Sequence, residues 1–163
     1  GGLDPETVRG ASGIDNGRKT TDADDIITRV STMIRHDRGI GDNARIDIPV
    51  AAVFSKFDAF APLVPPDCAV LQPSPHCGER SFDLTDWHNV DAEIRALLGE
   101  WGETGFTSQL ERGYTTYSYF SVSSLGLNNN PGRNGRIAQP RPHRIEDPLL
   151  WILSRKGIIP TKK

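Results

Sequence analysis

Hydrophobic and polar residues follow two different periods along the chain, and the changes of period predict its strands and helices. The clearest apolar run, Ile48 to Phe54, follows Asp47 and ends at the polar turn Ser55 to Asp58. A short apolar run bounded by turn residues is typical of a strand buried in a parallel sheet. Because ligands bind at the carboxyl ends of such strands, Lys56 and Asp58 become candidate binding residues.

Three segments carry apolar residues at helical spacing. The first covers 22–38, between the predicted N-cap Thr21 and Gly39, with the apolar positions Ile26, Ile27, Val30, Met33 and Ile34 facing a sheet. The second begins near Asp86, and the third begins with Asp147 as N-cap and Pro148 at the first position.

The remaining pattern completes an alternating order of strands and helices. Residues 2–5 resemble the end of a strand, 107–112 a short helical piece, and 114–122 a strand rich in β-branched and aromatic residues. Alternation of this kind predicts an α/β fold with mostly parallel strands and crossover helices. The segments 61–85 and 127–143 are predicted to be long loops, and the tail 161–163 to be frayed.

Length and charge narrow the classes of partner. The 163 residues predict one domain, 1–163, and 19 basic against 21 acidic residues give a net charge of −2. This balance argues against binding to nucleic acid or to a membrane surface, and favours a small molecule or a protein as partner. No apolar run approaches the roughly 20 residues of a membrane span, and no signal peptide pattern opens the chain. We therefore expect a cytoplasmic location.

Two groups of residues in the predicted loops have side chains that bind metals or anions. Asp67, Cys68, His76 and Cys77 are all able to ligate a metal, but their spacing matches no paired-ligand pattern, so we interpret the cysteines as reduced loop thiols. We interpret the one basic cluster as a solvated loop; it comprises Arg133, Arg136, Arg141, His143 and Arg144.

Two short motifs at strand ends resemble those of a known family. Ser55-Lys56-Phe57-Asp58 looks like the base-specificity motif of Ras-like P-loop GTPases, and Ser123-Ser124-Leu125 looks like their last motif. The frame around them, including 145–151 at the start of the last helix, resembles bacterial double-GTPase-like domains of the TRAFAC class. The resemblance implies the C-terminal half of a three-layer Ras-like P-loop NTPase fold.

The chemistry of the two motifs agrees with guanine binding. Guanine presents the ring N1–H and the exocyclic amine side by side, and the two oxygens of Asp58 match them as a fork. Lys56 would lay its stem along the purine, and Ser55 would tie neighbouring loops together. A main-chain N–H near Ser124, in the Ser123-Ser124-Leu125 motif, would donate to the guanine O6, while the Ser123 hydroxyl steadies the Asp58 loop.

The other half of a GTPase is missing from the pattern. A GTPase needs a phosphate-binding loop, a switch threonine and an Asp-x-x-Gly segment, and no segment supplies them convincingly. Gly13 to Thr20 ends in Lys-Thr but places Arg18 where the second glycine of the phosphate loop belongs. The chain thus resembles a partial GTPase domain in which GTP or GDP would meet Mg²⁺ only through an absent N-terminal half.

Three functions remain open at this stage. The first is the guanine-recognising half of a GTP-binding, GTP-hydrolysing switch whose own chain is not catalytically competent. The second is an inert GTPase-like module that contacts a protein partner through 61–85 and 127–143. The third is a small nucleotide-binding enzyme that uses Gly13 to Thr20 as an aberrant phosphate loop.

Overall fold

The computed structural model describes residues 23–79, 81–127 and 139–163. The chain divides into two compact units, and each is described by itself. Unit 1 comprises Gly1–Val50 and Arg95–Ser118, and unit 2 comprises Ala51–Ile94 and Tyr119–Lys163. The predicted strand end at 2–5, the N-cap Thr21 and the Gly13 to Thr20 segment lie outside the described residues.

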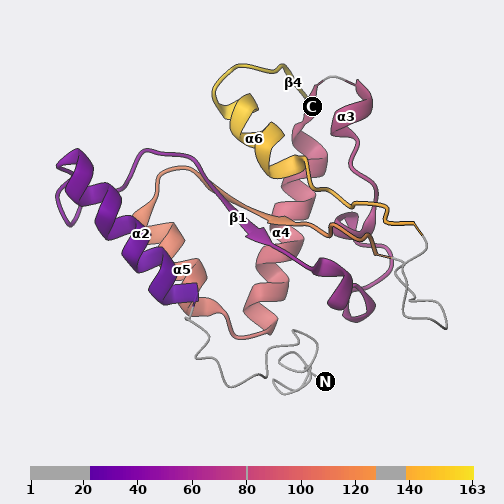
Figure 1. Ribbon diagram of the computed structural model, residues 1–163, viewed down its shortest axis with the longest axis horizontal. Coiled ribbons are helices and arrows are strands. Elements are labelled where there is room, and N and C mark those ends of the chain that lie inside the picture. The colour runs from indigo at the N-terminus through magenta and orange to yellow at the C-terminus, as the bar shows by residue number, and fades with distance from the viewer. Residues whose placement is uncertain (1–22, 80, 128–138) are drawn as a thin grey trace. The chain divides into compact units, whose positions relative to one another are not determined.

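Unit 1 is built on two helices, α2 (Ala23–Arg38) and α5 (Thr104–Gly113), which lie side by side (Figure 1). The Thr28 hydroxyl donates to Gln109 Oε1 at 3.0 Å, and the Ser31 and Tyr114 hydroxyls are 3.0 Å apart. Leu110 and Tyr114 are fully buried. The helix α5 begins earlier than the predicted piece 107–112, because the Thr-Gly pair at its start gives no helical signal.

The apolar face of α2 is only partly covered. Its boundaries agree with the predicted helix, which ends at Gly39 in the left-handed conformation with φ 62°. Ile27 is buried, but Ile26, Val30 and Met33 are exposed. The prediction that this face packs on a sheet is therefore wrong for these three side chains, and α2 packs mainly against α5.

Strands β1 (Val50–Phe54) and β3 (Tyr117–Ser121) form a two-stranded sheet. Ile46 pairs with Tyr114, Val50 with Thr116, and Phe54 with Val122. Residue numbers increase in the same direction in both segments, so the strands are parallel. The structure therefore confirms the α/β class with short parallel strands. Both strands are shorter than predicted.

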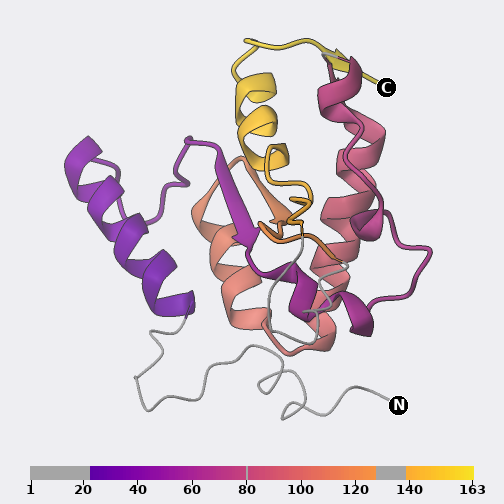
Figure 2. The same cartoon turned by 45° about the vertical axis from the view of Figure 1, so that its right-hand side comes forward.

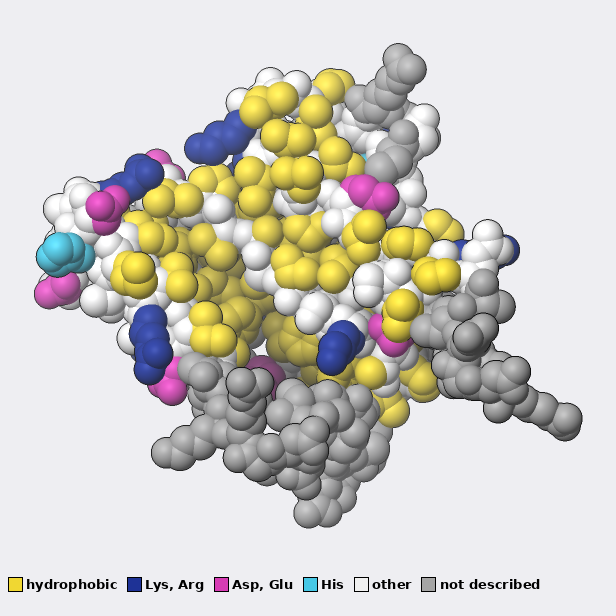
Figure 3. Space-filling model, viewed as in Figure 1, with side chains coloured by type: hydrophobic (Ala, Val, Ile, Leu, Met, Phe, Trp, Pro, Cys, Tyr) yellow, Lys and Arg dark blue, Asp and Glu magenta, His cyan; other side chains and the backbone are white. Residues whose placement is uncertain are grey.

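Unit 2 has an aromatic core. Phe82, Phe120 and Trp151 form its buried centre, and the Phe120 and Trp151 rings are 5.7 Å apart. Trp151 belongs to α6 (Asp147–Arg155), and Phe82 precedes α4 (Leu84–Glu100). The outer side of α6 remains apolar: Leu149 is 60% exposed, and Figure 3 shows hydrophobic side chains gathered over this helix.

The end of the chain is ordered, so the prediction of a frayed tail is wrong. Strand β4 (Thr161–Lys162) pairs in parallel with β2 (Phe82–Asp83), and Lys162 Nζ lies 3.3 Å from Asp83 Oδ2. Figures 1 and 2 show this C-terminal strand, in yellow, beside the start of α4. Two residues of pairing are too few to produce a periodic pattern in the sequence.

The segment 61–85 is also more regular than the predicted loop. It contains the 3-10 turns η2 (Ala61–Leu63) and η3 (Ala69–Leu71) and the short helix α3 (His76–Glu79). Val64 and Val70 are buried, and the two carboxylate oxygens of Glu93 accept from the N–H groups of Ala69 and Val70 at 2.8 Å each. A distant side chain therefore fixes turns that the local sequence does not specify.

The last helix starts at Asp147 with Pro148 in its first turn, and Glu146 takes the N-cap position. The predicted N-cap Asp147 is one residue too far along, because its carboxylate binds Ser74 and Arg144 instead of the helix end. Among the described helices, none has both the length and the apolar content needed to cross a membrane.

We predict that Phe82→Ala lowers the free energy of unfolding by about 3–5 kcal/mol, since it empties the centre of the aromatic core. The matched control Leu149→Ala, on the exposed side of α6, should change it by about 0.5 kcal/mol or less. Urea denaturation followed by tryptophan fluorescence measures both. Equal losses for the two variants would contradict the assignment of the core.

Candidate functional site

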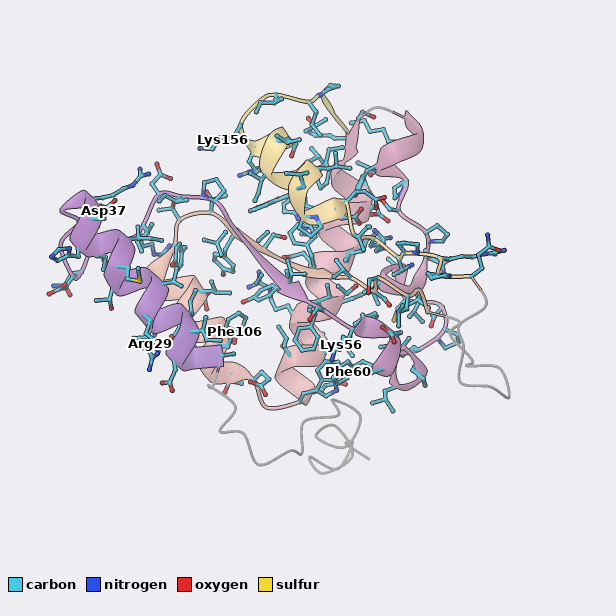
Figure 4. All side chains as sticks on the ribbon, in the orientation of Figure 1. Arg29, Asp37, Lys56, Phe60, Phe106 and Lys156 are labelled. Atoms are coloured by element: carbon cyan, nitrogen blue, oxygen red, sulfur yellow. The ribbon has the colours of Figure 1, made fainter. Side chains whose placement is uncertain are left out.

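The turn after β1 is held by a buried aromatic residue. Phe57 is 1% exposed, and its backbone N–H donates to the Val122 carbonyl at 3.1 Å. It opens the 3-10 turn η1 (Phe57–Ala59). Lys56, just before it, is exposed and adopts the left-handed conformation with φ 56° (Figure 4). This conformation is unfavourable for a residue other than glycine, so the surrounding contacts must enforce it.

The two predicted motifs meet through one hydrogen bond. The Ser123 hydroxyl donates to Asp58 Oδ1 at 2.5 Å. Ser123 is completely buried, Asp58 is half-buried, and the Ser123 Oγ also accepts from the Gly126 N–H at 3.1 Å. The sequence predicted that Ser123 steadies the Asp58 loop, and the structure confirms this contact.

The segment 141–143 forms backbone hydrogen bonds with the loop that begins at Ser123. Ser123 and His143 exchange both backbone hydrogen bonds, at 3.1 and 2.8 Å, and the Arg141 N–H donates to the Leu125 carbonyl at 3.1 Å. Gly126 has φ +92°, and a Cβ there would lie 2.1 Å from the Arg141 carbonyl oxygen. Only glycine fits this approach, so the loop and segment 141–143 determine each other's position.

Several polar groups of these motifs remain open to a ligand. Within the described residues, Asp58 Oδ2 receives no protein donor, and the N–H groups of Ser124 and Leu125 have no protein acceptor. Ser55, Lys56, Ser124 and Leu125 are exposed. In the same part of the chain, no hydrogen bond or ion pair joins the Ser55 or Lys56 side chain to the Ser123 loop. The structure joins Asp58 and Ser123 by a hydrogen bond, and among the described residues Ser55 forms no side-chain hydrogen bond to either of them.

A second polar cluster was not predicted from the sequence. Arg144 is 3% exposed, and its guanidinium donates to both oxygens of Asp86 at 2.8 and 2.9 Å and to Asp147 Oδ2 at 2.8 Å. The remaining N–H groups donate to the carbonyls of Ala69 and Gln72. The prediction that Arg144 lies in a solvated loop is wrong, because these acceptors satisfy every donor of the buried side chain. Of the cluster's other predicted members, His143 is half-buried and Arg141 exposed, while 133 and 136 lie outside the described residues.

His76 lies against the same carboxylates. Its Nδ1 accepts from the Asp83 N–H at 3.0 Å, so the neutral ring carries its proton on Nε2. Nε2 lies 3.5 Å from Asp86 Oδ2 and 3.8 Å from Asp147 Oδ2. The spacing of the residues did not predict this cluster; the only local hint was that Asp147 follows Arg144 by three residues.

The cluster is better suited to an arginine than to a metal. Within the described residues, His76, Asp86 and Asp147 are the metal-ligating side chains that group together, with ligand atoms within 4.8 Å of one another. The guanidinium of Arg144 already bridges both carboxylates, and a cation would have to displace it. Asp67 and Cys68 do not join this group, Cys68 is a free thiol, and the Cys77 side chain lies outside the described set.

Burial shifts the ionisation of the groups around Arg144. Desolvation lowers the pKa of His76, against the opposing effect of Asp147 and Asp86. Desolvation also lowers the pKa of His143, whose Nε2 lies 2.8 Å from the Val70 carbonyl. Burial disfavours the charged form of Arg144, but its hydrogen bonds to Asp86 and Asp147 prevail and raise its pKa. The arginine therefore remains charged while both imidazoles favour the neutral form.

Comparison with known proteins gives no relative for the chain. No protein-family model, curated protein or solved structure matches it significantly.

We predict that the stability of unit 2 falls as the pH drops below about 6.5, the ordinary pKa of histidine. The folded pKa values of His76 and His143 are lowered, so the unfolded chain takes up protons first and acid favours unfolding. This stabilisation is fully present above pH 6.5 and is lost as the pH falls towards the folded pKa values. Thermal melts at pH 7.5, 6.5 and 5.5 measure the effect.

His76→Gln should flatten this dependence, whereas His36→Gln, on the exposed surface of α2, should leave it unchanged. A melting temperature of the wild-type chain that rises between pH 7.5 and 5.5 would contradict the assignment.

Proposed function

We propose that this chain recognises the guanine base of GTP or GDP, as the C-terminal half of a Ras-like P-loop GTPase domain of the TRAFAC class. The observation that carries the proposal is the hydrogen bond from Ser123 to Asp58, which joins two motifs although these residues lie 65 positions apart in the sequence. Neither motif alone is specific. The resemblance implies that Ser123 contacts Asp58, and two unrelated surface turns would have no reason to form this contact.

Asp58 has the acceptor capacity that guanine needs. A carboxylate offers about four lone-pair sites on two oxygens, and the Ser123 hydroxyl uses one of them on Oδ1. The remaining sites on Oδ1 and Oδ2 can accept the guanine N1–H and the exocyclic amine together. Adenine presents no such pair of donors, so this fork selects guanine over adenine.

The neighbouring groups complete the recognition of the base. The exposed N–H groups of Ser124 and Leu125 are donors of the kind that the guanine O6 accepts, and Lys56 offers a long apolar stem and a cation beside Asp58. Ser55 occupies the position at which the family usually has Asn or Thr. The left-handed backbone of Lys56 is consistent with strain held at a binding turn.

The phosphates and Mg²⁺ would be bound by a phosphate loop and switch segments supplied from outside these motifs. In this proposal the chain contributes affinity and base selectivity, and hydrolysis requires the rest of a complete domain. Because the chain would bind only the base, we expect it to bind a guanine nucleotide weakly, with a dissociation constant on the order of millimolar.

The alternative, an inert module that binds a protein through 61–85 and 127–143, has less physical support. Glu93, His143 and Arg144 bind the backbone of residues 69–72 inside unit 2. Backbone groups engaged in this way are not available to a partner.

We predict that Asp58→Asn weakens GMP binding about tenfold or more, since hydrogen bonds to a charged group contribute about 1.5–3 kcal/mol. The same change should improve XMP binding, because the introduced amide donates to the xanthine C2 carbonyl while its oxygen accepts from N1–H. Backbone amide shifts in two-dimensional NMR, recorded during GMP and XMP titrations, measure both affinities at millimolar concentrations.

The amide oxygen introduced by Asp58→Asn can still accept from the Ser123 hydroxyl, so the loop should keep its structure in this variant. Asp67→Asn, which changes an exposed aspartate of the same unit, is the matched control and should bind as wild type does. An unchanged preference between GMP and XMP in the Asp58→Asn chain would refute the role of Asp58.

A further inference from the structure

We propose that Arg144 is a positioning residue for the base site: its buried guanidinium fixes the backbone that holds Ser123 against Asp58. This inference rests on the proposed function of Asp58 but concerns a residue outside both motifs. Its parts all belong to unit 2, in the loop 123–126, the segment 141–144 and the turn 69–72.

The guanidinium of Arg144 is held at every nitrogen. Its fork meets Asp86 with two parallel hydrogen bonds of 2.8 and 2.9 Å, while Nη1 also reaches Asp147 at 2.8 Å. Nε donates to the Gln72 carbonyl at 2.9 Å and Nη2 to the Ala69 carbonyl at 3.0 Å. With all five donors of a planar group engaged, the side chain has one permitted orientation.

The acceptors of this side chain are themselves fixed. Asp147 accepts a second hydrogen bond from the Ser74 hydroxyl at 2.6 Å. The turn that supplies the carbonyls of Ala69 and Gln72 is bound by Glu93 at its N–H groups, and its Val70 carbonyl lies 2.8 Å from His143 Nε2. Residues 143 and 144 therefore both attach to one rigid turn.

The position of Arg144 is transmitted directly to Ser123. Arg144 adopts the left-handed conformation with φ 52°, and its neighbour His143 exchanges two backbone hydrogen bonds with Ser123. The Ser123 hydroxyl then binds Asp58 at 2.5 Å. Two residues before His143, the Arg141 carbonyl occupies the space that a side chain at Gly126 would need. The loop thus has little freedom to move while Arg144 stays in place.

Lysine cannot reproduce this arrangement. It keeps the positive charge but replaces the planar fork by a single ammonium with three donors, so it cannot bind Asp86 in parallel and still reach two carbonyls. Arg144→Lys therefore loosens the segment without leaving the buried Asp147 and the partly buried Asp86 without a positive charge. Arg141→Lys is the matched control, since Arg141 is exposed and uses only its backbone in the described contacts.

The test measures the loop and the ligand separately. Amide hydrogen exchange of Ser123 and His143, recorded by NMR without nucleotide, reports whether Arg144 fixes the loop. GMP titrations of wild type, Arg144→Lys, Ser123→Ala and the double variant form a double-mutant cycle, which isolates coupling between the two residues. Asp86→Asn, which leaves the Asp147 pair intact, replaces Arg144→Lys if that variant does not fold.

In Arg144→Lys we expect the backbone amides of Ser123 and His143 to exchange hydrogen about tenfold faster than in wild type. The exchange rate of the Trp151 amide in the core should not change. GMP binding should weaken about fivefold. In the Ser123→Ala background the same change should alter GMP affinity less than about twofold, because the link to Asp58 is already cut. Arg141→Lys should leave exchange and affinity as in wild type.

Equal additive losses in both backgrounds, or uniform acceleration of exchange throughout unit 2, would show a merely structural role and overturn the inference. Absence of GMP binding by the wild-type chain would instead overturn the proposed function. In that case the exchange of Ser123 and His143 still decides whether Arg144 positions the loop.

Discussion

The buried charge of Arg144 is the constraint on which the structure of unit 2 depends. Leaving such a charge without partners costs about 3–5 kcal/mol, so the chain must bring acceptors to it. It does so from three places: Asp86 at the start of α4, Asp147 at the start of α6, and the carbonyls of Ala69 and Gln72. One guanidinium thus joins two helices to a turn that has little regular structure of its own.

The same constraint shapes the candidate base site. Because His143 is fixed beside Arg144 and paired with Ser123, the serine hydroxyl is directed at Asp58 before any ligand arrives. A carboxylate already oriented by one hydrogen bond loses less conformational entropy when it binds two more donors. Lys56, Ser124 and Leu125 are exposed to solvent. A buried serine that orients the carboxylate, together with exposed neighbouring residues, suits the recognition of a small planar base.

The sequence predicted those elements of the fold that are determined by short stretches of neighbouring residues. The apolar run to Phe54 and the period of 22–38 predicted β1 and α2, and Pro148 marked the start of α6. The contact of Ser123 with Asp58 was also expected, from the resemblance of the two motifs to those of Ras-like GTPases. The long-range bonds of Arg144 were not predicted: the residue was assigned to a loop because Asn, Gly and Pro surround it, although the partners Asp86, Ala69 and Gln72 lie far away in sequence. The pairing of β2 with β4 was not predicted for the same reason.

The proposed role of Asp58 is to bind a guanine base while the Ser123 hydroxyl holds the carboxylate in place. A crystal structure of the chain with bound GMP tests it most directly. The account predicts the guanine N1 and exocyclic amine within about 2.7–3.2 Å of the two Asp58 oxygens, the O6 facing the N–H of Ser124 or Leu125, and the Ser123 contact intact. GMP bound elsewhere on the chain, or a base at this turn that leaves Asp58 without a hydrogen bond to guanine, would contradict it.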